Sequence, residues 1–146
     1  MTSRRVAREC ALETLYRLDL VGDDPDTVID EILSRKNPSR EAEEYLRRLV
    51  AAVLDKQADI DTLLRRHLRR WRLERLTALD RAALRFGAAE LLYFTDVPPK
   101  VVINEAVDIA KKFGDDNAGR FVNGVLDSVY REARPDKDKE PEAEAE

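Results

Sequence analysis

Clusters of positively charged side chains are the residues of this sequence whose types and spacing suggest chemistry. The first cluster is Arg4, Arg5 and Arg8, and no acidic residue precedes Glu9. Arg4 and Arg8 are separated by one helical turn, so on a helix they share one face. Arginine forks fit phosphate oxygens and stack on unpaired bases. The cluster fits contact with RNA, and ordinary solvated charge explains it equally well.

A second cluster combines cations with aromatic rings. Its members are Lys111, Lys112, Phe113, Gly114, Arg120 and Phe121. Positive charge beside aromatic rings is what proteins use to bind single-stranded RNA. The alternative is that both phenylalanines fill the hydrophobic core, an interpretation that applies above all to Phe121.

The third cluster is the densest run of positive charge in the chain. It extends from Arg65 to Arg72 and contains Trp71. One interpretation is an RNA-binding surface. The other is a solvated helix end, whose arginines pair with nearby glutamates and complement the negative end of the helix dipole. The sequence leaves both interpretations open.

Residue sets typical of catalysis or metal binding are missing from the sequence. His67 is the only histidine and Cys10 the only cysteine, whereas a structural zinc site needs four ligands of this kind. Cys10 lies on an apolar helical stripe, where burial keeps a thiol unreactive. No glycine-rich phosphate-binding loop occurs. We therefore expect a protein that is not an enzyme and that uses no metal or cofactor.

The composition indicates one helical domain followed by a charged tail. Of the 146 residues, 43% are hydrophobic and 38% are charged, which favours helices with charged outer faces. Residues 136–146 contain six acids and two lysines, so they account for the whole formal charge of −4. We expect a single domain over residues 1–134 and a disordered acidic tail over residues 135–146. Neither a membrane span nor a signal peptide is recognisable, so a cytoplasmic protein is expected.

Apolar residues recur at helical spacing through most of the chain. The pattern predicts an all-α fold of about seven helices, with breaks at Gly22–Pro25, Asn37–Ser39, Gln57–Asp59, Leu73–Thr77, Asp96–Pro99 and Gly114–Asn117. The expected N-caps are Ser3, Asp24 and Ser39. Gly114 is expected to end a helix in the left-handed conformation. Residues 78–94 are apolar on several sides, which is typical of a central helix, and Gly124 suggests a close helix crossing.

Four segments of the chain together resemble a known family. They are DVPPKVVINEAVDIAKKFG at residues 96–114, GRFVNGVLD at 119–127, LDRAALR at 79–85 with Glu90 and Leu91 after it, and RVARECALETLY at 5–16. In combination they resemble the NusB transcription antitermination family, over nearly the whole chain except the tail and residues 21–37. The resemblance implies two three-helix bundles that share a core.

The resemblance also implies a function and partners. Members of this family bind boxA RNA, a short single-stranded element of ribosomal RNA leader transcripts, together with NusE, a small-subunit ribosomal protein. The pair joins a complex on RNA polymerase that suppresses termination. Members occur as monomers or homodimers, so the oligomeric state of this chain stays open.

Carried over by position, the resemblance implies two groups of binding residues. The RNA-binding residues would be Arg4, Arg5, Arg8, Lys112, Phe113, Asn117, Arg120 and Phe121. The NusE-binding residues would be Leu76, Asp80 and Arg81. Asn117 stands where relatives often carry an acid, and loss of that negative charge should favour RNA binding.

Two other functions fit the same sequence. The chain could be a helical protein-interaction module whose charged faces only keep it soluble. It could also be related to the NusB-like domain of ribosomal RNA cytosine methyltransferases, but those chains continue into a catalytic domain, whereas an acidic tail follows here. The antitermination factor is the function we expect.

Overall fold

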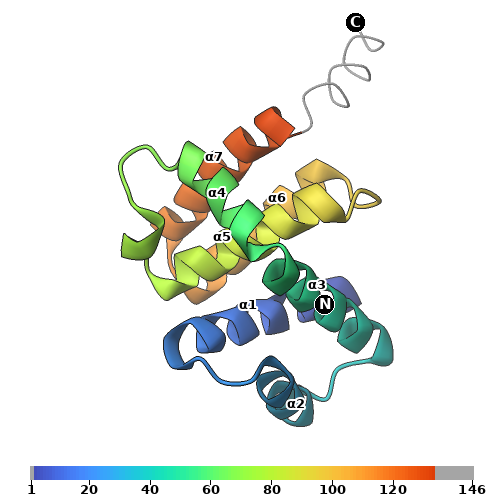
Figure 1. Ribbon diagram of the computed structural model, residues 1–146. Helices are drawn as coiled ribbons and strands as arrows, with labels where there is room; N and C mark the ends of the chain where they lie inside the picture. The colour runs from blue at the N-terminus through green and yellow to red at the C-terminus, as the bar shows by residue number, and fades with distance from the viewer. Residues whose placement is uncertain (1, 134–146) are drawn as a thin grey trace, which may run out of the picture.

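A computed structural model describes residues 2–133 of the chain, which are helical almost throughout (Figure 1). The elements are α1 (Ser3–Val21), α2 (Pro25–Lys36), α3 (Arg40–Asp55), α4 (Gln57–His67), the short 3₁₀ turn η1 (Leu73–Arg75), α5 (Ala78–Tyr93), α6 (Pro99–Phe113) and α7 (Asp116–Ala133). The predicted all-α fold is therefore confirmed. The tail predicted over residues 135–146 lies outside the described residues.

Side chains that cap the helices explain where most of them begin. The predicted caps Asp24 and Ser39 are confirmed, since each side chain accepts the backbone N–H of the third residue after it. The prediction for α1 was one residue too late. Thr2 is its N-cap, and its hydroxyl accepts the Arg5 N–H at 3.0 Å. Thr77 caps α5 in the same way.

The ends of the helices agree only in part with the sequence prediction. Gly22 ends α1 in the left-handed conformation with φ 76°. Gly114 does not, because its φ is −113° and its ψ −110°, so that prediction is wrong. Close packing is what requires glycine there: an added Cβ would lie 2.9 Å from the Ala110 carbonyl oxygen and 2.9 Å from a methyl group of Leu79.

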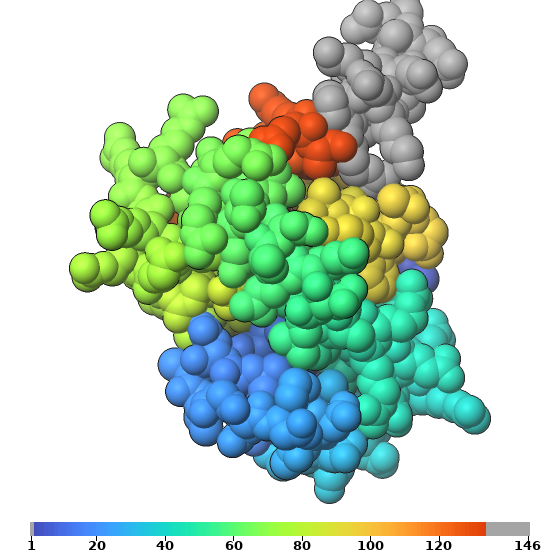
Figure 2. All heavy atoms as spheres, viewed as in Figure 1, coloured from blue at the N-terminus to red at the C-terminus, as the bar shows by residue number. Residues whose placement is uncertain are grey.

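The helices form two bundles that share one core. α1, α2 and α3 make the first bundle, and α5, α6 and α7 make the second, with α4 packed against α5 and α7. α5 contacts α1 and α3 of the first bundle as well as its own neighbours, which confirms its predicted central place. The space-filling view shows the two bundles in direct contact (Figure 2). No helix within residues 2–133 is long and apolar enough to cross a membrane.

Two glycines within helices differ in whether the surrounding structure leaves room for a side chain. Gly87 of α5 faces α7 so closely that an added Cβ would lie 2.6 Å from a methyl group of Leu126. At Gly124 of α7 an added Cβ would meet nothing within 4 Å. The close helix crossing predicted at Gly124 is therefore wrong.

Candidate nucleic-acid interface

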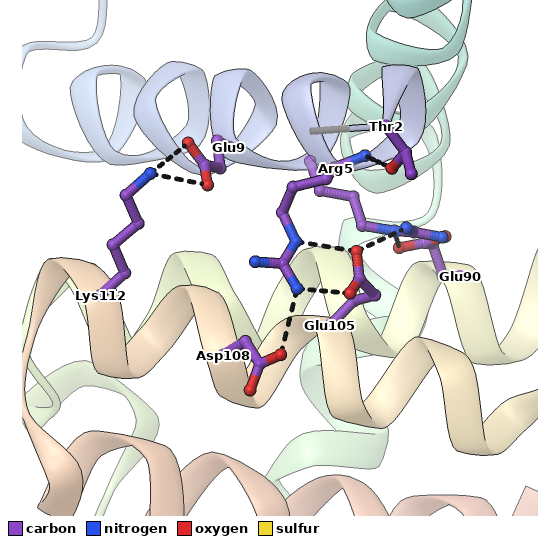
Figure 3. Close-up of polar contacts among 8 residues, drawn as sticks. Thr2, Arg5, Glu9, Glu90, Glu105, Asp108 and Lys112 are labelled. Carbon is purple, nitrogen blue, oxygen red and sulfur yellow. Dashed lines mark hydrogen bonds and ion pairs between the residues drawn. The ribbon is translucent and has the colours of Figure 1, made fainter.

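Ion pairs between α1 and α6 hold the N-terminal residues against the second bundle (Figure 3). Arg5 forms a two-pronged pair with Glu105, at 2.9 and 2.5 Å, and also bonds Asp108 at 3.1 Å. About one turn after Asp108 on α6, the Lys112 ammonium contacts both carboxylate oxygens of Glu9 at 3.1 Å. Arg5 holds the pKa of Glu105 below its ordinary value. These pairs align α1 with α6, so that Arg5 lies opposite the middle of α6 and Glu9 lies opposite its end.

Arg8 points inward and joins the two bundles. Its guanidinium donates to the two carboxylate oxygens of Glu90 at 2.6 and 2.8 Å, and the residue is 2% exposed. The Tyr45 hydroxyl also donates to Glu90, at 2.6 Å. Burial alone would lower the pKa of Arg8, but the hydrogen bonds and charge of Glu90 raise it. Arg8 shares no exposed surface with Arg4, and RNA contact by Arg8 stays a prediction that requires this pair to open.

Arg4 lies on the surface above the ring of Tyr45 in α3. Its guanidinium is 4.9 Å from the centre of the Tyr45 ring and reaches Asp96 at 3.8 Å. Arg48 of α3 lies over the same ring, 5.7 Å from its centre, and 4.7 Å from the ring centre of Phe94. Arg48 was not predicted from the sequence, because only the fold brings it to the ring that Arg4 also contacts.

The junction of α6 and α7 gathers most of the second predicted cluster. Phe113 is 49% exposed, so it does not fill the core, and the Lys112 ammonium lies 5.3 Å from its ring centre. Asn117 and Arg120 are exposed on the first turns of α7 and bond to each other. Phe121 is half-buried and packs against the core, as its alternative interpretation expected.

A cleft between α5 and α7, here called the α5–α7 cleft, contains two of the three predicted partner residues. Its walls include Trp71, Leu76, Leu79, Asp80, Asn117 and Phe121. Burial raises the pKa of Asp80, and the charge of Asp115 adds to this effect. Arg81 turns away from the cleft, because its guanidinium binds Asp19 at 2.8 Å and the Leu76 carbonyl oxygen at 2.5 Å. Arg81 therefore holds the connection that precedes α5.

A second cleft on the other side of Leu79 was not anticipated from the sequence. It lies between α1 and α6, and the residues that line this α1–α6 cleft include Val6, Cys10, Tyr16, Leu79, Lys112 and Phe113. Tyr16 is 39% exposed, whereas Cys10 is 3% exposed and lies at the base. Burial raises the pKa of the Cys10 thiol. An exposed tyrosine on a predicted amphipathic helix was the signal that could have pointed to this surface.

The third cluster divides into two halves with different surroundings. Arg65 pairs with Glu74 at 2.7 Å, and Arg66 and His67 both pair with Glu132. This half matches the interpretation as a solvated helix end with ion pairs. The other half, Arg69 to Arg72, lies in the connection after α4 and exposes 59% of Trp71.

Comparison with known proteins decides the family of the chain. The model of the NusB family matches residues 5–131. The chain belongs to the NusB family. It is 42% identical to the transcription antitermination protein NusB of Symbiobacterium thermophilum over 137 residues, which cover 88% of this chain and 90% of that protein.

Solved structures of NusB proteins have the same fold. NusB of T. maritima superposes with a TM-score of 0.86 at 36% identity, covering 94% of this chain and 98% of that one. A crystal structure of the antitermination factors NusB and NusE in complex with dsRNA has a chain with a TM-score of 0.84 at 38% identity, covering 90% of this chain and 98% of that one. Within residues 2–133 no group of three or more His, Cys, Asp or Glu residues gathers to hold a metal.

Proposed function

We propose that this chain binds boxA RNA of ribosomal RNA transcripts together with NusE, and that the pair joins an RNA polymerase complex that suppresses termination. Membership of the NusB family supports this proposal, as does the solved complex of NusB, NusE and dsRNA. The chain acts by binding, and its interface supplies cations, one exposed ring and an amide.

The observation that carries the RNA part is the surface at the junction of α6 and α7. Phe113 exposes half of its ring, Arg120 supplies positive charge after the turn, and Lys112 before the turn is shared with Glu9. An aromatic face stacks on an unpaired base, while the cations neutralise the phosphates that flank it. Asn117 can donate to a base or phosphate and places no negative charge beside the strand.

We propose that NusE covers the α5 wall of the α5–α7 cleft at Leu76 and Asp80. Asn117 forms part of the opposite wall of the same cleft. RNA and NusE would therefore meet across it, and each would extend the surface that the other binds. This arrangement predicts that NusE and boxA RNA raise each other's affinity by the same factor.

The proposal is tested by fluorescence anisotropy with labelled boxA RNA and with a scrambled RNA of the same composition. We expect boxA to bind more tightly than the scrambled RNA, above all with NusE present, and the affinity to fall steeply with salt. Phe113→Ala should weaken binding by about 5- to 150-fold, the range that corresponds to loss of one stacked base. Arg120→Gln should reduce the salt slope by about 0.7.

Lys56→Gln is the matched control, because Lys56 is exposed at the junction of α3 and α4 and lines neither cleft. It should leave boxA affinity unchanged. Equal affinity for boxA and scrambled RNA in the presence of NusE would refute the proposal. If Arg4→Glu leaves RNA binding intact while NusE binds normally, the N-terminal surface has no part in RNA recognition.

A further inference from the structure

The connection between α4 and α5 carries an unusual set of unpaired groups. Trp71 is 59% exposed, although a tryptophan offers the largest side-chain surface for burial. Around it, Arg69, Arg70 and Arg72 are exposed, and within residues 2–133 none of the three makes an ion pair or a side-chain hydrogen bond. Figure 2 shows side chains of this connection projecting from the surface.

The contrast with the preceding helix turn indicates that this exposure is not a general property of the segment. Arg65 and Arg66 lie only a few residues earlier, and carboxylates of Glu74 and Glu132 neutralise them. The positive charge of the connection is therefore concentrated in the three arginines that flank the exposed indole ring. Although the charge of Arg72 also acts on Glu74, exposed cations around an exposed aromatic face are suited to a polyanion that carries flat rings.

The connection is also continuous with the proposed RNA surface. Trp71 and Arg75 line one end of the α5–α7 cleft, whose other wall contains Asn117 and Phe121. Asp80 and Asp115 lie within the cleft. These carboxylates repel phosphates and accept hydrogen bonds from base amino groups. A strand that crosses the cleft would therefore turn its bases inward and keep its phosphates on the arginine rim.

We propose that Trp71, Arg69, Arg70 and Arg72 form a second contact for the same single-stranded RNA, beyond the segment bound at Phe113 and Asn117. Trp71 stacks on an unpaired base, and the three arginines neutralise phosphates on both sides of that base. This inference rests on the proposed RNA-binding function and extends the RNA footprint across the α5–α7 cleft. A docking site for a protein partner is the competing occupant, but a protein would need to supply acids for three arginines at once.

The test uses two RNAs, boxA alone and boxA extended by unpaired nucleotides at either end, each titrated with NusE present. Trp71 is the only tryptophan of the chain, so the emission difference between the wild type and Trp71→Phe isolates its signal. We expect one extended RNA to quench this emission and to bind more tightly than boxA alone. Trp71→Ala should lower the affinity for that extended RNA by about 5- to 150-fold and leave boxA alone unchanged.

The arginines are tested by salt dependence. The triple variant Arg69→Gln, Arg70→Gln, Arg72→Gln should reduce the salt slope for the extended RNA by about 2. The control removes exposed cations elsewhere, as Lys56→Gln with Arg131→Gln, and should leave that slope almost unchanged.

The outcomes separate this inference from the function on which it rests. If boxA binds but extension changes neither affinity nor Trp71 emission, the second contact does not exist and the proposed function stands. If neither RNA binds, both proposals fail. If Trp71→Ala weakens NusE binding while RNA affinity is unchanged, the connection is a protein-docking site and the inference is overturned.

Discussion

Removal of one partner of the buried Arg8–Glu90 pair should destabilise the fold by about 3–5 kcal/mol. The side chains of Arg8 and Glu90 are 3% and 0% exposed, and two hydrogen bonds join them. Arg8→Met would leave the Glu90 carboxylate in the core with only the Tyr45 hydroxyl as a strong donor. Glu90→Leu would leave the guanidinium of Arg8 with Glu105 alone, at 3.2 Å. Domains of this size have a stability of about 5–15 kcal/mol, so either loss is a large fraction of the total.

The assay is equilibrium unfolding in urea, followed by the helical circular dichroism signal, on both single variants and the double variant. Two apolar side chains of similar volume can replace a buried ion pair at little cost, so the double variant should lose much less stability than the sum of the single losses. Tyr45→Phe, which removes one hydrogen bond to a charged group, should cost about 1.5–3 kcal/mol. Arg40→Met on the exposed face of α3 is the control and should change stability by less than about 0.5 kcal/mol.

The reasoning fails if either single substitution costs less than about 1 kcal/mol, a value typical of exposed ion pairs. It also fails if the double variant shows simple additivity, because groups that bond each other directly must show a coupling energy. In that case Arg8 would not be a structural link between the bundles, and contact with RNA would become the better explanation of its charge.

Two further perturbations follow from the packing and the ion pairs. Gly87→Ala should be less stable than Gly124→Ala by about 1–3 kcal/mol in urea unfolding, because only the first forces a methyl group against Leu126, whereas both share the gain in helix propensity; equal stabilities would contradict the close approach of α5 and α7. Arg5 lowers the pKa of Glu105 below the ordinary 4.5 in the folded state. The pair therefore stabilises the fold above that pH, and its effect is lost as the pH falls through the lower folded-state pKa. The stability difference between the wild type and Glu105→Gln should shrink as the pH falls below about 4.5, and a constant difference would contradict it.

The helices could be predicted because their signals are local. Apolar spacing, the capping side chains of Asp24 and Ser39 and the proline at the start of α2 all lie within a few residues of the boundary that they determine. The break between α3 and α4 was placed slightly late. It lies at Lys56, where no side chain caps the start of α4, so the sequence carried no capping residue that would indicate this helix boundary.

The inner partner of Arg8 could not be found from local patterns. Glu90 is distant in the sequence, and only the packing of α1 on α5 brings the two side chains together. One signal was present, since Glu90 stands among the apolar residues Ala88, Ala89 and Leu91 of a central helix. A carboxylate in such a place requires a cation. Similarly, Gly114 was assigned to a left-handed helix end because glycine is common there, whereas contacts with Ala110 and Leu79 are what exclude a side chain.

The buried thiol at the base of the α1–α6 cleft allows local opening of the structure to be measured through its reactivity. Cys10 is the only cysteine and is 3% exposed, and burial raises its pKa. A thiol reagent can therefore react only in molecules where α1 has moved away from its neighbours, and the labelling rate measures how often that occurs. A partner that closes this cleft would slow the labelling, so the rate reports occupancy of the cleft without an engineered cysteine.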